Sequence, residues 1–167
     1  PINVYGESKL FGEQQVRAVL GSDALIIRTA WLYAREGENF LHTMLRVMQE
    51  RDEVQVVDDQ IGTPTCAERL ARAIWIAIDR KLSGIHHWTD AGVASWYDFA
   101  VAICAKAVSV GLIEDPAKVV PVPSSAYPTN AKKPAYSVLC KTRTWNALEV
   151  KPDHWQRSLH KSISTLK

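Results

Sequence analysis

The feature that most restricts the fold is a short continuous apolar run at residues 24–28, Ala-Leu-Ile-Ile-Arg. A run of this length without polar alternation is typical of a strand that is buried on both faces. It follows a segment with helical character over residues 7–20, and Gly21 is a suitable place for that helix to stop. Because a helix followed by a doubly buried strand is the repeating unit of parallel sheets, the sequence predicts an α/β fold.

Helix-start signals continue this alternation along the chain. Asn39 is a favourable N-cap, and apolar residues recur at helical spacing after it. Thr65 with Glu68, and Ser95 with Asp98, have the spacing of capping boxes. The sequence therefore predicts three further helices, one after each of these signals.

Strands are expected at residues 54–57 and 85–88, and two closing helices at residues 141–148 and 152–163. From Gly111 onward the composition changes, because prolines break the chain into extended pieces and turns. These prolines are Pro116, Pro121, Pro123, Pro128 and Pro134.

Composition narrows the class of protein. The 167 residues are 47% hydrophobic and 23% charged, as in an ordinary globular domain with one core. A net charge of +2 gives no argument for nucleic acid or an anionic membrane as a partner. No apolar run has the length of a membrane span, and no signal peptide is visible. The three cysteines are odd in number and widely spaced, which favours reduced thiols and a cytoplasmic location.

Tyr5 and Lys9 are the first candidates for catalysis. They are four residues apart and share one face if the segment is helical. A nearby ammonium favours the ionised form of a phenol and lowers its pKa, so the pair could exchange a proton with the oxygen of a ketone. The alternative is a surface tyrosine and lysine that share a helix face by chance, since this spacing is common.

Other candidates lie in loops. Trp31 follows the strand at residues 24–28, where open α/β sheets bind ligands, and it could cover a sugar or nicotinamide ring or simply pack in the loop. Asp58 and Asp59 resemble a carboxylate pair, but no other ligand type is spaced to join them, so turn and capping roles are favoured and no metal is expected. His86 and His87 are adjacent on an expected strand and point to opposite faces, which favours structural roles.

A series of short motifs resembles the dTDP-4-dehydrorhamnose reductase family, which belongs to the extended short-chain dehydrogenase/reductases. The motifs occur in family order and cover nearly the whole chain. They are Asn3-Val4-Tyr5-Gly6, Ser8-Lys9-Leu10, Gly12-Glu13, Arg28-Thr29-Ala30-Trp31, Asn39-Phe40, Thr43-Met44-Leu45-Arg46, Asp59-Gln60, Gly62, Pro64-Thr65, Ser95-Trp96-Tyr97-Asp98-Phe99-Ala100, Tyr127-Pro128-Thr129, Ala131, Pro134, Ser137 and Leu139.

The resemblance implies a fold and a division of the chain. Residues 1–167 would be a C-terminal fragment that lacks the N-terminal dinucleotide-binding half. About residues 1–35 and 54–90 would form the end of a Rossmann-like parallel sheet with flanking helices. The remainder would form mainly a small mixed α/β substrate-binding lobe. The opening Pro1, directly before a candidate catalytic pair, also suggests a longer parent protein.

The resemblance also implies residue roles. Tyr5 would donate a proton to the C4 keto oxygen of dTDP-4-dehydro-L-rhamnose, and Lys9 would hold the nicotinamide ribose and lower the pKa of Tyr5. Trp31 would lie against the deoxyhexose, while Asn39 and Gln60 fall in segments that border the nucleotide-sugar pocket. The family takes its hydride from NADPH, or sometimes NADH.

Departures from the family pattern lead to further expectations. No glycine-rich dinucleotide fingerprint occurs, so this chain alone is expected to bind NADPH poorly and to be inactive. The Arg-Pro of many relatives is Lys133-Pro134 here, which loses a bidentate contact to phosphate. A truncated sheet would expose an edge, so a homo-oligomer or pairing with another chain is expected. Two alternatives stay open: a nucleotide-sugar epimerase of the same superfamily, and a non-catalytic subunit like the β subunit of methionine adenosyltransferase.

Overall fold

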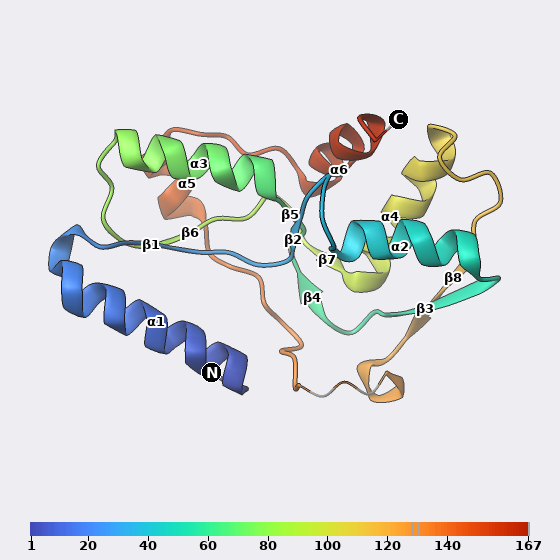
Figure 1. Cartoon of the computed structure of the whole chain (residues 1–167), viewed down its shortest axis with the longest axis horizontal. Helices are drawn as coiled ribbons and strands as arrows, with labels where there is room; N and C mark the ends of the chain where they lie inside the picture. The colour runs from blue at the N-terminus through green and yellow to red at the C-terminus, as the bar shows by residue number, and fades with distance from the viewer. Residues whose placement is uncertain (128, 130, 167) are drawn as a thin grey trace.

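Two of the parallel strand pairs lie in two different halves of the molecule in the computed structural model (Figure 1). The structure describes residues 1–127, 129 and 131–166, so the expectation for Pro128 lies outside the described residues. Strand β1 (Leu25–Arg28) pairs with β6 (Gly84–His87), with Leu25 opposite Gly84 and Arg28 opposite His87. Strand β3 (Glu53–Val57) pairs with β8 (Lys118–Val122). The mixed α/β architecture with parallel strands confirms the fold class expected from the sequence.

Helices cover the β1–β6 pair from two sides (Figure 1). Helix α1 (Val4–Leu20) lies on one side, and α3 (Ala67–Asp79) with α5 (Thr142–Leu148) lies on the other. Apolar residues of α3 and α5 pack with Trp88 and with β1 in one core cluster. All of α1 is described, and none of its residues is buried. The surface of α1 is therefore accessible to a ligand or to another chain.

The residues at its two ends explain where α1 begins and ends. The side chain of Asn3 accepts a hydrogen bond from the Gly6 amide at 2.8 Å, which satisfies one of the free donors of the first turn. Gly21 ends the helix with a φ of 56°, a left-handed value that a residue with a Cβ adopts at a cost. The helix begins three residues before the expected position 7, so Tyr5 lies inside it.

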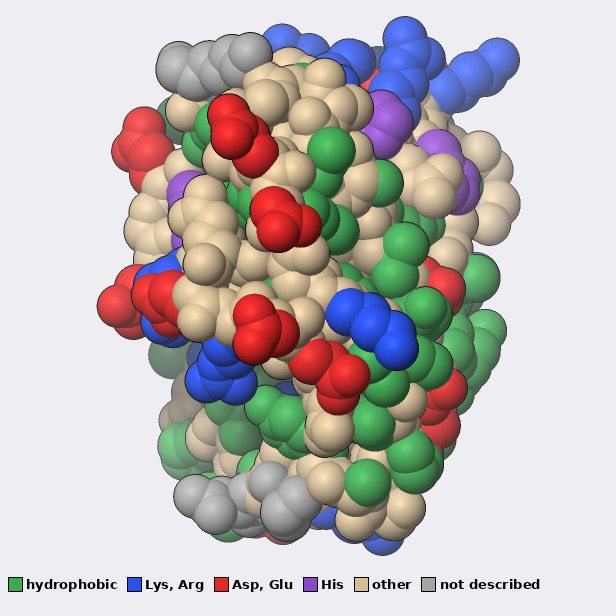
Figure 2. Space-filling model, turned by 90° about the vertical axis from the view of Figure 1, so that its right-hand side faces the viewer, with side chains coloured by type: hydrophobic (Ala, Val, Ile, Leu, Met, Phe, Trp, Pro, Cys, Tyr) green, Lys and Arg blue, Asp and Glu red, His purple; other side chains and the backbone are tan. Residues whose placement is uncertain are grey.

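The main core lies in the half of the molecule that contains β3 and β8. Helix α2 (Phe40–Glu50), helix α4 (Trp96–Ser109) and helix α6 (Trp155–Ser164) pack here around Leu41, Met48, Phe99, Ile103 and Leu159. The surface at this end mixes acidic, basic and apolar side chains without a field of one sign (Figure 2). This agrees with the small net charge of +2.

Two helix starts that the sequence predicted for this half are confirmed. Asn39 caps α2 by accepting from the Leu41 and His42 amides. Ser95 and Asp98 form the expected capping box of α4.

Short strand pairs join the two halves. Strand β2 (Leu32–Tyr33) runs parallel to β5 (Thr65–Cys66), and β4 (Ile61–Gly62) runs antiparallel to β7 (Ala94–Ser95). Two 3₁₀ turns complete the elements, η1 (Gly21–Asp23) and η2 (Ser124–Ala126).

The capping box expected at Thr65 and Glu68 is wrong. Thr65 belongs to β5, its amide donates to the Trp31 carbonyl, and its hydroxyl donates to the Thr63 carbonyl. Because Thr65 is part of a strand pair, it does not cap α3. Cys66 has the N-cap position of α3 and makes no side-chain hydrogen bond there. The last helix also begins later than the expected residue 152, because His154 caps it.

The expected strands at 24–28, 54–57 and 85–88 are present as β1, β3 and β6. Strand β3 pairs with β8 rather than with β1 or β6, since the described strands form separate pairs. The division of the chain into two lobes at the stated boundaries stays a prediction. Among the helices of the described residues, none combines the length and hydrophobicity needed to cross a bilayer.

Candidate functional site

Helix α1 presents the candidate catalytic pair to solvent. The Nζ atom of Lys9 lies 5.2 Å from the centre of the Tyr5 ring, so the expected sharing of one helix face is observed. Tyr5 is 69% exposed, which leaves its hydroxyl free for a ligand. The pair is thus assembled within one turn of helix.

One ion pair ties α1 to the sheet. Arg28, at the end of β1, donates two hydrogen bonds to the Glu13 carboxylate, at 2.7 and 2.6 Å. These hydrogen bonds lower the pKa of Glu13 and raise that of Arg28. A two-pronged contact of this kind fixes direction as well as distance, so the helix that carries Tyr5 has a defined orientation on β1.

Trp31 lies directly after β1 and is held in an unusual position. Its φ of 50° is left-handed, which is uncommon for a large side chain. Its indole stacks on that of Trp96, with ring centroids 3.7 Å apart and planes inclined by 10°. Gly62 lies under the Trp31 ring, where an added Cβ would come within 2.3 Å of Cε2. The absence of a side chain at Gly62 therefore allows this stack.

A cavity of about 250 Å³ adjoins Trp96. Its lining combines aromatic rings, amides, hydroxyls and one ammonium group: Phe40, Thr43, Met44, Gln55, Val56, Val57, Gln60, Trp96, Tyr127, Thr129 and Lys133. Lys133 Nζ lies 6.0 Å from the Trp96 ring centre. Flat aromatic surfaces with a few polar groups and a cation suit a planar base or a sugar that carries phosphate.

The candidate binding residues differ in whether they line this cavity. Gln60 lines this cavity, whereas Trp31 is not among its described lining residues and is connected to it through its stack on Trp96. Asn39 is not among the described lining residues, because its side chain is used locally. Its amide donates to the carbonyls of Ala34, Glu36 and Gly37, and its oxygen caps α2. Asn39 therefore shapes the loop that leads into α2.

Trp96 is the main residue that sequence reasoning did not single out as part of a site. Its ring packs on that of Phe40, with 4.8 Å between ring centroids. The sequence signal for Trp96 was its position directly after the Ser95 N-cap. The first residue of a helix lies at the helix end, where its side chain is accessible to groups outside the helix.

The remaining candidates have structural partners. The Asp59 carboxylate accepts from the amide and hydroxyl of Ser124 and so caps η2, as favoured from the sequence. His86 contacts the Ser83 carbonyl, and His87 contacts the Cys140 carbonyl. The described part of the chain holds no group of three His, Cys, Asp or Glu side chains placed to share a metal ion.

Comparison with known proteins identifies the family to which the chain is similar. The model of the RmlD substrate binding domain matches residues 1–167. The chain is similar to a dTDP-4-dehydrorhamnose reductase of Burkholderia thailandensis, with 45% identity over 150 residues, which cover 83% of this chain and 50% of that protein.

Solved structures give the same result. The crystal structure of a dTDP-4-dehydrorhamnose reductase from Clostridium acetobutylicum has a TM-score of 0.88 and 40% identity, and the match covers 99% of this chain and 56% of that one. The enzyme of the same description from Bacillus anthracis, in complex with NADP, has a TM-score of 0.87 and 35% identity, covering 96% and 55%. The chain spans about half the length of the relatives that it matches.

Proposed function

The chain belongs to the RmlD substrate binding domain family, and from this membership we propose that it forms the substrate-binding half of a dTDP-4-dehydrorhamnose reductase. The reaction is reduction of the C4 keto group of dTDP-4-dehydro-L-rhamnose. The observation that carries the proposal is the aromatic cavity lined by Trp96 and Gln60, with Trp31 stacked against it. In this proposal Trp31 lies against the deoxyhexose, Gln60 bonds the nucleotide sugar, and Asn39 shapes the entry loop.

Tyr5 and Lys9 supply the acid chemistry. The Tyr5 hydroxyl donates its proton to the C4 oxygen as negative charge develops there. The Lys9 ammonium, which makes no ion pair within the described ranges, stabilises the phenolate that remains and binds the nicotinamide ribose. Bound NADPH, or NADH, supplies the hydride. The exposed pair on α1 fits one end of such a cofactor, and the Bacillus anthracis relative was solved with NADP.

This chain alone is proposed to bind sugar nucleotide and not to turn over. It has no G-x-G-x-x-G turn to hold the cofactor's pyrophosphate. The cytoplasmic location belongs to the same proposal and is supported by the free state of Cys66, Cys104 and Cys140.

The test is calorimetric titration of the chain with dTDP-rhamnose and, separately, with NADPH. Binding of dTDP-rhamnose that weakens about tenfold or more in Gln60→Ala would support the proposal. Gln49→Ala is a matched control, because Gln49 donates to the Leu112 carbonyl outside the cavity. Absence of dTDP-rhamnose binding would contradict a formed substrate site. Steady NADPH oxidation by the chain with dTDP-4-dehydrorhamnose would contradict its inactivity alone.

Product analysis separates this function from the two alternatives. A reductase that contains this chain consumes one NADPH per sugar, whereas an epimerase returns the hydride and consumes none. A non-catalytic subunit would bind a partner protein and leave NADPH unchanged. Stoichiometric NADPH loss with the 4-keto sugar is the expected result.

A further inference from the structure

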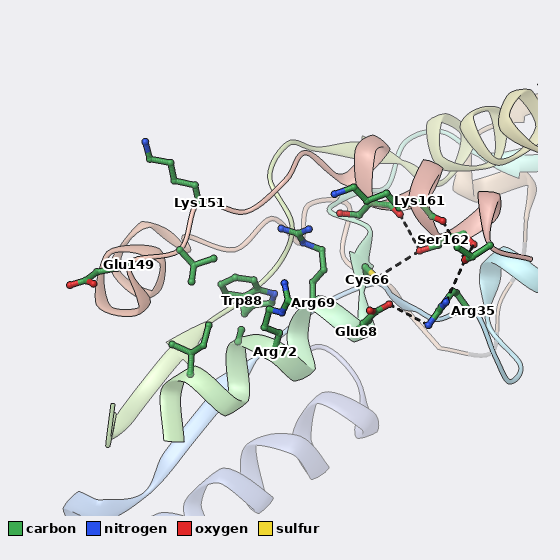
Figure 3. A pocket seen from close by; sticks show the side chains of 15 residues that line it. Arg35, Cys66, Glu68, Arg69, Arg72, Trp88, Glu149, Lys151, Lys161 and Ser162 are labelled. Carbon is green, nitrogen blue, oxygen red and sulfur yellow. Dashed lines mark hydrogen bonds and ion pairs between the residues drawn. The ribbon is translucent and has the colours of Figure 1, made fainter. Parts of the chain in front are cut away.

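A second and larger cavity of about 640 Å³ lies between α3, α6 and the segment after α5 (Figure 3). Among the described residues it shares no lining residue with the aromatic cavity at Trp96. Its volume is within the range of small-molecule sites. The proposed reductase reaction uses none of its residues, so the cavity needs an account of its own.

Positive side chains dominate the lining. Five are basic, namely Arg35, Arg69, Arg72, Lys151 and Lys161, whereas two are acidic, Glu68 and Glu149. Some of these charges are already paired: Arg69 and Lys161 with Asp153 at 2.7 and 3.0 Å, Arg35 with Glu68 at 3.6 Å, and Glu149 with Arg80 at 2.8 Å. Within the described ranges, Arg72 and Lys151 make no ion pair. Two cations are therefore free to meet an anion.

Buried polar atoms at the base of the cavity also lack partners. The Trp88 indole nitrogen and the Ser158 hydroxyl have no hydrogen-bond partner within reach among the described residues, although Ser158 lies beside the Asp90 carboxyl, which pairs with Nε of Arg69 at 3.5 Å. Trp88 is 2% exposed and Ser158 is 3% exposed, and both line the cavity. A buried donor left without an acceptor is unfavourable, so such atoms usually have a partner. An acceptor-rich ligand would supply one.

The cavity has an apolar wall as well. Ala73 and Ile76 of α3 lie on one side, with Val150 from the segment after α5. Figure 3 shows Arg69 and Arg72 extending from α3 beside the Trp88 ring. The site therefore offers an apolar surface next to cations and hydrogen-bond donors, which is the arrangement that binds an organic body carrying an anionic group.

We propose that this cavity binds a phosphate monoester whose organic part is apolar or aromatic. The dianionic phosphate would accept hydrogen bonds from Arg72, Trp88 Nε1 and Ser158. The organic part would lie against Ala73, Ile76 and Val150. Phosphate is favoured over a single carboxylate because Arg72 and two neutral donors line the same cavity, and three terminal oxygens can meet more of these groups than the two of a carboxylate.

The experiment uses phenyl phosphate as the probe and two-dimensional amide and indole NMR spectra of the chain as the readout. Saturable shifts are expected for the Trp88 indole and for the amides of Ala73, Ile76 and Val150. Amides of Thr43 and Gln60, which line the other cavity, are expected to keep their positions. Inorganic phosphate should bind more weakly, because it lacks the organic part.

Variants make the test specific. Arg72→Glu should weaken phenyl phosphate binding about tenfold or more, and Ser158→Ala should weaken it without a change in charge. Arg51→Glu, with the same charge change at the C-terminal end of α2, should have no effect. The proposal fails if the shifts do not saturate, if they gather at Thr43 and Gln60, or if Arg51→Glu weakens binding as much as Arg72→Glu. Failure here would leave the dTDP-rhamnose result unaffected, because the two cavities are separate.

Discussion

Trp31 and Trp96 lie face to face, with ring centroids 3.7 Å apart, although 64 residues separate them in the chain. The stack joins the end of β1 to the start of α4 and so connects the strand that precedes the candidate site with the helix that forms its aromatic wall. Lys133 approaches the Trp96 ring at 6.0 Å, and Phe40 packs against it as well. The position of the Trp31 ring therefore decides the shape of this wall.

Gly62→Ala is expected to displace the Trp31 ring. The new Cβ would lie 2.3 Å from Trp31 Cε2, closer than any real contact, so the ring must move off Trp96. Binding of dTDP-rhamnose should weaken about tenfold or more. Calorimetry measures that loss, and the far-ultraviolet circular dichroism couplet of two stacked indoles should fall with it. Gly12→Ala is the control, because nothing lies within 4 Å of an added Cβ there. Unchanged binding and couplet in Gly62→Ala would contradict the role of the stack.

Tyr5→Phe is expected to remove catalysis and to leave sugar-nucleotide binding nearly unchanged. A positioned proton donor contributes about 10²–10⁴-fold to rate, so kcat of the reductase that contains this chain should fall by that factor. Binding should persist, because Tyr5 is not among the described residues of the aromatic cavity. Tyr136→Phe is a matched control, since Tyr136 is 68% exposed and Tyr5 is 69% exposed. Retention of full kcat in Tyr5→Phe would exclude Tyr5 as the proton donor.

Local signals in the sequence predicted much of the fold. The apolar run before Arg28, the Asn39 N-cap and the Ser95–Asp98 box correspond to observed elements, because each depends on neighbours within a few residues. Strands β2, β4, β5 and β7 were not predicted, since two-residue strands have no periodicity and exist only through pairing with distant segments. The same pairing removed Thr65 from its expected capping role.

The candidate site divides in the same way. The Tyr5–Lys9 pair could be read from the sequence, because helix geometry alone places these two side chains together. The partnership of Trp31 with Trp96, and the space that Gly62 leaves for it, could not, because tertiary folding creates both. Asn39 was expected in a segment that borders the pocket, but its side chain makes hydrogen bonds within its own loop and at the start of α2. Sequence spacing does not show whether an asparagine side chain bonds to nearby backbone or to a ligand.

The open face of α1 predicts concentration-dependent association of this chain. Phe11 and Val19 are 61% and 81% exposed, and among the described strands β1 is paired only with β6. Exposed apolar surface next to a free strand edge favours pairing with another chain. Sedimentation should show reversible self-association that Phe11→Glu weakens. Val93→Glu, at a position 53% exposed on another part of the surface, should not weaken it. A monomer at all concentrations would contradict this prediction.

The buried carboxyl of Asp90 predicts an unusual dependence of stability on pH. Asp90 is fully buried, and burial raises its pKa from 3.8 to about 6 despite the nearby charge of Arg69. Its Oδ1 lies 3.5 Å from Arg69 Nε, and its Oδ2 accepts a hydrogen bond from the Cys66 amide at 3.4 Å. Asp153, Lys141 and Ser158 are the other polar groups around it. A carboxyl with a raised pKa binds its proton more tightly in the folded state than in the unfolded state.

The direction of the effect follows from that difference. Between about pH 4 and about pH 6 the folded state holds more protons, so the free energy of unfolding should fall as pH rises and level off above about pH 6. The loss should be on the order of 3 kcal/mol or less. Urea unfolding across this range should show the fall in the wild type and not in Asp90→Asn, whose amide does not titrate. Asp115→Asn, at an exposed position, should keep the wild-type dependence. A constant stability difference between wild type and Asp90→Asn at every pH would show that Asp90 does not carry the effect.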